Sequence, residues 1–160
     1  MEEPTQLPTV EPPRGMFPAH VDEKGRAKLP VPIQRYFGAL TEKKLFVTST
    51  NRSTAQVYPI AAWKENEKFL DDYRDDPEAA ENTTFSANEF GVETEMDGQG
   101  RILMPPELRR HLGIENQQVR VYFHRGHLEI LSEKTFEARR QKADEKAATD
   151  HVTMMKAGMK

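Results

Sequence analysis

The chain has 160 residues, 31% of them charged and 36% hydrophobic, and a formal net charge of −3 at pH 7. No apolar run approaches the roughly 18 residues of a membrane span, and the first residues lack the basic start and apolar middle of a secretory signal. There is no cysteine, which excludes disulfides and thiolate metal sites. These features favour a cytoplasmic protein with one folded unit.

The chain begins with a proline-rich stretch and then introduces a motif that it later repeats. Residues 1–13 contain four prolines and are predicted to be a disordered extension. The sequence DEKGR starts at Asp22, and DGQGR starts at Asp97. Continued over 17 residues, the two segments match at six positions, where about one match is expected by chance. The sequence therefore predicts two copies of one unit, at residues 14–63 and 91–136.

Each copy is predicted to begin with a strand, a tight turn and a second strand. Asp22 and Asp97 stand at the first turn position, where a carboxylate accepts hydrogen bonds from backbone N–H groups a few residues on. Gly25 and Gly100 provide the positive φ that a tight hairpin often needs. These four residues are interpreted as turn-organising.

A short helix is predicted next in each copy. Pro30 and Pro105 suit the start of a helix, where the missing N–H has no cost, and Gly38 and Gly113 suit its C-cap. Apolar residues lie four apart on one face, as Ile33 with Phe37 and Leu108 with Leu112. Two strands should follow each helix, near Leu45–Thr50 and Gln56–Tyr58 in the first copy and Val119–His124 and Leu128–Leu131 in the second.

The segment between the copies, residues 64–90, is predicted to be a helical connector. Helical spacing relates Trp63, Phe69, Leu70 and Tyr73. Pro77 ends that pattern, and a second helix is expected over Pro77–Asn88. Because this segment is acidic, the aromatic residues are interpreted as core or subunit-interface residues and not as a nucleobase-stacking set.

The C-terminal segment, residues 137–160, is rich in Ala, Glu, Lys and Arg, which favours a helix. Ser132 is placed as its N-cap. The last ten residues are expected to fray.

Charge is distributed unevenly along the chain. Residues 14–52 carry eight Lys or Arg against three Asp or Glu, and residues 98–127 carry five against two. Residues 64–97 carry three against twelve. The repeated motif therefore lies in the two basic segments, and a local basic face governs contact with phosphate.

Arg26 and Arg101 follow the turn glycines and are the leading candidates for contact with DNA. Arginine grips phosphate and bonds bidentately to guanine in the major groove. Lys24 and Lys28 flank the first arginine, whereas Gln99 is the neutral counterpart of Lys24 in the second loop. The alternative is that each arginine only pairs with the aspartate of its own turn.

Several stretches resemble the MraZ family across roughly Gly15–Arg140. They are VYPIAAW after the first copy, GRILMPPELRRHLGI and HLEILSEKTF in the second, and the twin Asp-x-x-x-Arg motifs. The family is similar to AbrB-type swapped-hairpin DNA-binding domains. The resemblance implies a mainly β (α+β) double-split barrel in which one chain supplies both interleaved units.

The resemblance also implies a function. A MraZ-type protein would be a transcriptional regulator that binds double-stranded DNA, act on the promoter of the division and cell-wall gene cluster through repeated boxes, and assemble as a homo-oligomeric ring. Its place would be the cytoplasm and nucleoid. An AbrB-like antitoxin that also binds a toxin protein stays an alternative. So does a ring-forming interaction protein without a DNA role, with its arginines in subunit contacts.

Metal binding and catalysis find little support. His124 and His127 flank an Arg-Gly turn with no cysteine or carboxylate to complete a ligand set. The chain contains no phosphate-cradling glycine loop and no Gly-x-Ser-x-Gly motif. We therefore expect no enzyme activity, no metal, no cofactor, no small-molecule substrate and no membrane partner.

Overall fold

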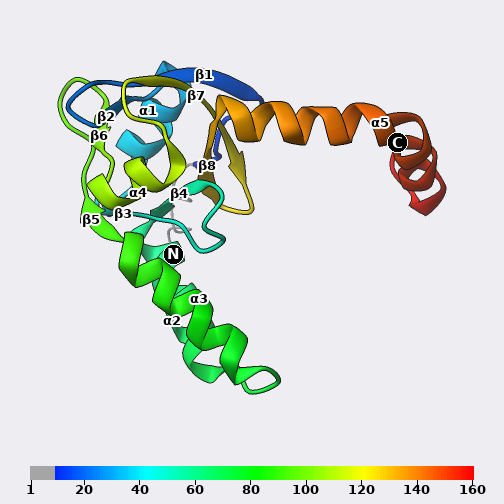
Figure 1. Ribbon diagram of the computed structural model, residues 1–160, viewed down its shortest axis with the longest axis horizontal. Coiled ribbons are helices and arrows are strands. Elements are labelled where there is room, and N and C mark those ends of the chain that lie inside the picture. Colours follow the sequence, from blue (N-terminus) through cyan, green and yellow to red (C-terminus); the bar gives the residue numbers. More distant parts are fainter. Residues whose placement is uncertain (1–9) are drawn as a thin grey trace, which may run out of the picture.

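The computed structural model describes residues 10–160, whose eight strands form one antiparallel sheet. The strand order is β5-β3-β4-β8-β7-β1-β2-β6. This sheet curls into a barrel-like body, from which a helical hairpin and one long helix project in different directions (Figure 1). The edge strands β5 and β6 are consecutive in the chain, so the second loop joins the two edges and nearly closes the barrel.

The strands are β1 (Met16–Val21), β2 (Arg26–Lys28), β3 (Leu45–Thr48), β4 (Ala55–Pro59), β5 (Val92–Thr94), β6 (Arg101–Leu103), β7 (Gln117–His124) and β8 (His127–Ser132). The helices are α1 (Val31–Ala39), α2 (Ile60–Asp72), α3 (Pro77–Phe90), α4 (Pro106–Leu112) and α5 (Glu133–Ala157). Each predicted strand is present, with ends shifted by up to two residues.

The two repeats interleave strand by strand. The pairs β1 with β7, β3 with β5, β2 with β6, and β4 with β8 each join a strand of the first repeat to one of the second. If each strand of the first repeat is exchanged with the equivalent strand of the second, the pair β1–β7 becomes the pair β5–β3. The pairs β2–β6 and β4–β8 are unchanged by this exchange. The structure therefore confirms the mixed α and β fold expected of a swapped-hairpin barrel.

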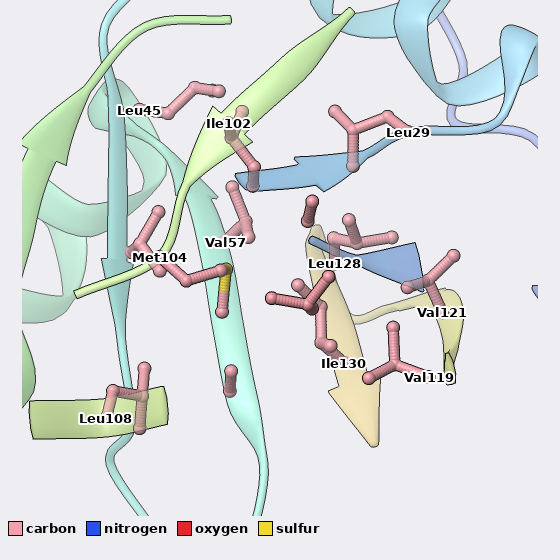
Figure 2. Close-up of a cluster of buried hydrophobic side chains, with 14 of the residues drawn as sticks. Leu29, Leu45, Val57, Ile102, Met104, Leu108, Val119, Val121, Leu128 and Ile130 are labelled. Atoms are coloured by element: carbon pink, nitrogen blue, oxygen red, sulfur yellow. The ribbon is translucent and has the colours of Figure 1, made fainter. Parts of the chain in front are cut away.

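The core of the barrel is built by both repeats together. Side chains alternate between the two faces of each strand, so Leu128 and Ile130 of β8 point inward with Val119 and Val121 of β7 (Figure 2). The other large residues with no more than 1% exposure are Val21, Leu29, Ile33, Leu45, Val47, Val57, Ile102, Met104, Leu108 and Ile114. Each repeat has an apolar face that it could not bury without the other repeat.

The two short helices end differently. Gly113 has a φ of 66° and caps α4, as predicted. The prediction that Gly38 caps α1 is wrong, because the helix continues to Ala39. There the chain leaves the helix in extended conformation at Leu40, whose N–H donates to the carbonyl of Phe37. No positive φ is needed at Gly38.

Helices α2 and α3 form a projecting hairpin, which we call the helical arm (Figure 1). Asp76 caps α3 by accepting a hydrogen bond from the N–H of Ala79. At the base of the arm Trp63 is 6% exposed and stacks on Phe46 at 4.8 Å between ring centroids. Trp63 therefore packs within the chain, as the core interpretation predicted. Phe69, farther along the arm, is 61% exposed.

Helix α5 leaves the barrel, and none of its residues is buried. Ser132 caps it, accepting a hydrogen bond from the N–H of Thr135 at 3.1 Å. The helix runs to Ala157, within the ten residues that are expected to fray. Gly158 ends it at a φ of 121°, and the next N–H donates to the carbonyl of Met154.

The predicted N-terminal extension and the expected absence of a membrane span are compared here with the described residues. Residues 1–9 of the predicted extension lie outside the described part, and residues 10–15 form neither helix nor strand. Among the described residues no helix is both long and apolar enough to cross a bilayer.

Candidate nucleic-acid interface

The two copies of the repeated motif meet in the β2–β6 ladder. At its centre Ala27 pairs with Ile102, and both side chains are buried. On either side Arg26 pairs with Leu103, and Lys28 pairs with Arg101. Because side chains alternate along a strand, these four share the outer surface of the ladder.

We call this outer surface, with the loop residues Lys24 and Gln99, the ladder face. The two loops lie at opposite ends of the ladder because its strands are antiparallel. The ladder lies at the end of the barrel remote from α5, and α1 and α4 lie beside it (Figure 1).

Each loop is organised by its aspartate. Asp22 Oδ1 accepts hydrogen bonds from the N–H groups of Lys24 and Arg26, both at 2.9 Å. Asp97 Oδ1 does the same for Gln99 and Arg101, again at 2.9 Å. The backbone N–H of each arginine is the main reason that the pKa of its aspartate lies below the usual 3.8. Both carboxylates are therefore ionised at neutral pH.

The same aspartates also hold the arginine side chains, but only by one nitrogen. Arg26 Nε donates to Asp22 Oδ2 at 3.1 Å, and Arg101 Nε donates to Asp97 Oδ2 at 2.9 Å. The pairing suggested by the alternative interpretation is therefore present. However, it leaves both terminal nitrogens of each guanidinium without a hydrogen bond inside residues 10–160, on side chains that are 32% and 24% exposed. These donors are available to an incoming acceptor.

Each loop glycine is covered by a side chain from the other repeat. Gly25 lies under Arg109 of α4, and Gly100 lies under Gln34 of α1. Arg109 Nη1 also donates to the carbonyl of Met104, and Gln34 Nε2 donates to that of Leu29, both at 2.6 Å. We call Gln34 and Arg109 the cross-braces.

Backbone hydrogen bonds complete this exchange between the repeats. The N–H of Leu29 donates to the carbonyl of Gly100 at 2.9 Å, and that of Met104 donates to the carbonyl of Gly25 at 2.8 Å. Each loop is therefore fixed by the segment after the other loop. The two loops are joined into one hydrogen-bonded unit.

The sequence interpretation missed the cross-braces. Gln34 and Arg109 occupy the same position in the aligned repeats, twelve residues after each aspartate. Their equivalent positions are a signal of a shared role, but residue identity does not show it, because one is glutamine and the other is arginine.

The charges on the ladder face are distributed differently from the sequence expectation. Lys28 was grouped with Arg26, but it lies across from Arg101 and its Nζ donates to the carbonyl of Gln99. The first loop instead receives Arg109, whose side chain is 14% exposed and whose Nε is buried without a hydrogen bond. Arg109 Nε lies 3.6 Å from the carboxylate of Glu115. Both loops therefore carry cationic neighbours.

Of the two histidines that flank the Arg-Gly turn, His127 is buried and His124 is exposed. His127 Nε2 lies 2.7 Å from Glu129 Oε1, and its ring lies 4.5 Å from that of Tyr58. Glu129 also accepts a hydrogen bond from Thr54 at 2.6 Å. No group of three or more His, Cys, Asp or Glu within residues 10–160 is arranged to hold a metal ion.

Comparison with known proteins gives consistent matches. A family model described as "MraZ protein, putative antitoxin-like" matches residues 91–157. A protein of Acidobacterium capsulatum named transcriptional regulator MraZ is 32% identical over 123 residues, which are 77% of this chain and 84% of that protein. Proteins of the same name from Thermomicrobium roseum and Variovorax paradoxus are 32% and 30% identical over 78% and 81% of this chain, and 84% and 89% of theirs.

Proposed function

This chain belongs to the MraZ family, and on that basis we propose that it is a transcriptional regulator that binds double-stranded DNA through the ladder face. The matched relatives are named as regulators and not as enzymes. The observation that carries the proposal is the placement of Arg26 and Arg101 on one outer surface with free terminal donors.

The shape of the ladder suits the major groove of DNA. That groove is about 12 Å wide and admits a two-stranded β-ribbon. In β2–β6 the core-facing residues are small or aliphatic, and the outward residues are two arginines, one lysine and one leucine. Arg26 and Arg101 would donate to guanine edges or phosphate, and Lys24 and Lys28 would add phosphate contacts. Gln99 could bond to an adenine edge.

Rigid loops suit recognition of a defined sequence. The Asp–Arg pairs hold each guanidinium by Nε, and the cross-braces hold the loop backbone. A side chain that is already oriented loses less conformational freedom on binding. In this proposal Asp22, Asp97, Gly25 and Gly100 act by setting the loop geometry.

One ladder face offers few base contacts, so we include self-association in the proposal. A homo-oligomeric ring would engage several repeated boxes at once and multiply weak contacts through avidity. The target that the family implies is the promoter of the division and cell-wall gene cluster, with the protein acting in the cytoplasm at the nucleoid. The proposal invokes no cofactor and no small-molecule substrate.

Footprinting of the protein on the DNA upstream of its own gene tests this function. We expect protection of a short box that recurs at regular spacing. We also expect the logarithm of the binding constant to fall linearly with the logarithm of the salt concentration. Each phosphate contact should add about −0.9 to the slope of that line. If no box is protected and DNA binding does not change with salt, the result would instead support an interaction protein whose arginines serve subunit contacts.

The antitoxin role is the second candidate, favoured by the words "antitoxin-like" in the description of the matched family. An antitoxin would form a stable complex with a toxin protein in addition to binding DNA. Copurification of one specific protein, whose toxicity the chain relieves, would establish it.

A further inference from the structure

The end of α5 carries an apolar stripe that covers nothing in the chain. Val152 and Met155 lie three residues apart and share one face of the helix, and Met159 follows the Gly158 that ends it. They are 49%, 45% and 47% exposed. The ten residues from His151 to Lys160 contain two lysines and no acidic residue. The end of α5 is thus both apolar and basic.

The helical arm has the opposite charge and its own exposed apolar residues. Residues 60–90 carry nine Asp or Glu against three Lys or Arg. Phe69 and Phe85 are 61% and 67% exposed, and the ring of Tyr73 lies 5.4 Å from that of Phe69. A hollow of about 580 Å³ at this point is lined by Glu65, Lys68, Phe69, Asp72, Tyr73, Arg74 and Asp75.

These two surfaces cannot meet within one chain. Helix α5 packs against β7 and β8 near its start, where Arg120 lies over Phe136 at 4.4 Å. From there it runs away from the barrel, while the helical arm leaves the barrel in another direction (Figure 1). At 1.5 Å per residue, the 25 residues of α5 follow a path of about 37 Å, and its last turns bend downward in the view of Figure 1. Its end is therefore presented outward, well away from its own arm.

We propose that the end of α5 docks in the hollow of the helical arm of a second copy of this chain. Apolar residues would meet Phe69 and Tyr73. Lys156 and Lys160 would face the acidic residues around the hollow, which outnumber its basic ones by three to two. Methionine is flexible and makes favourable contacts with aromatic rings, which suits an aromatic-lined hollow. The inference rests on the proposed self-association and names its two surfaces.

Such a contact joins two different surfaces, so it is heterologous. Heterologous contacts close into rings when the rotation between subunits allows it. One helix end in one hollow is small beside the roughly 1,600 Å² of a standard stable interface. A closed ring compensates for the small area of each contact, because each subunit makes two such contacts. The contact that closes the ring also forms within one assembly, at high effective concentration. Both surfaces lie away from the ladder face, which stays open to DNA.

Mass measurements on full-length variants by analytical ultracentrifugation, without DNA, test the docking. Met155→Glu and Phe69→Glu each place a charge in the apolar contact, and we expect both to lower the wild-type oligomer to smaller species. Thr153→Glu adds the same charge on α5 off the stripe and should keep the wild-type mass. All three positions are exposed, so the melting temperature should stay at the wild-type value.

Charge reversal provides the complementary test. Lys156→Glu and Asp72→Lys should each reduce the mass, and the double variant should recover it, because every contact in the ring regains opposite charges. A Met155→Glu protein with the wild-type mass, or a double variant no larger than the single ones, would overturn the docking. A wild-type protein that sediments as one chain would overturn the self-association as well. DNA binding is measured separately and decides neither outcome.

Discussion

The guanidinium of Arg109 covers Gly25 so closely that a β-carbon added there would lie 1.9 Å from Arg109 Nη1. Gly25 also has a φ of 84°, a conformation that side chains with a β-carbon rarely adopt. Gln34 covers Gly100 in the same way, 2.2 Å from the position of a β-carbon. Each loop is therefore shaped by a helix from the other repeat, and the loops and the packing between repeats form one structural unit.

Gly25→Ala should destabilise the protein. The left-handed conformation alone costs a non-glycine residue about 1–2 kcal/mol, and the new methyl group must also displace Arg109 from the carbonyl of Met104. In an Arg109→Ala background the second cost disappears, so Gly25→Ala should cost less there. Urea unfolding of the four proteins measures this coupling. Strictly additive free energies would show that the contact between Arg109 and Gly25 has no energetic role.

The two loop aspartates should make the protein sensitive to acid. The pKa of Asp22 and that of Asp97 are lowered in the folded state, chiefly by the backbone N–H of Arg26 and of Arg101. Their contribution to stability is present above the unfolded pKa and is lost as pH falls through the folded value. The free energy of unfolding should therefore decrease below about pH 4.

Replacing both aspartates with asparagine tests their share of this acid sensitivity. The double variant has no charge to lose at these positions. It should be less stable than the wild type at neutral pH, and its stability should depend less on pH below about pH 4. Urea midpoints measured across the acidic range compare the two proteins. An acid dependence identical to that of the wild type would mean that other carboxylates cause it.

Residues 1–80 alone should not form a stable monomer. Within the first repeat only the β1–β2 and β3–β4 pairs remain, and the partners of β1, β2, β3 and β4 in the second repeat are lost. The inward faces of those strands would then be exposed to water, which opposes folding. Dispersed amide resonances and a cooperative thermal transition for this fragment at monomer mass would contradict the interleaved barrel.

The repeat and its local elements could be read from the sequence because turn chemistry is local. An aspartate, a glycine and an arginine at fixed spacing define each loop, and both prolines mark the helices that follow. The error at Gly38 has a local cause too. A glycine is not required at the end of α1, because the chain leaves the helix in extended conformation at Leu40.

What the sequence could not reveal is contact between the repeats. Gln34 reaches Gly100, and Arg109 reaches Gly25, across separations of 66 and 84 residues. Lys28 likewise belongs to the second loop through a partner on the neighbouring strand. The sequence left Trp63 as a core or a subunit-interface residue, and its packing on Phe46 and Tyr58 depends on the strands that carry them. These relationships depend on strand register, which a motif alone does not specify.

Binding of Arg26→Ala and Arg101→Ala to the protected upstream box tests the central claim most directly. Arg139→Ala, which removes the same charge from an exposed position in the first half of α5, is the matched control. Each loop variant should lose about 1–3 kcal/mol per base contact, or roughly 5- to 150-fold in affinity per site. The control should bind as the wild type does, and all three should keep its melting temperature and oligomer mass. Wild-type affinity in both loop variants would show that the ladder face is not the DNA-binding surface.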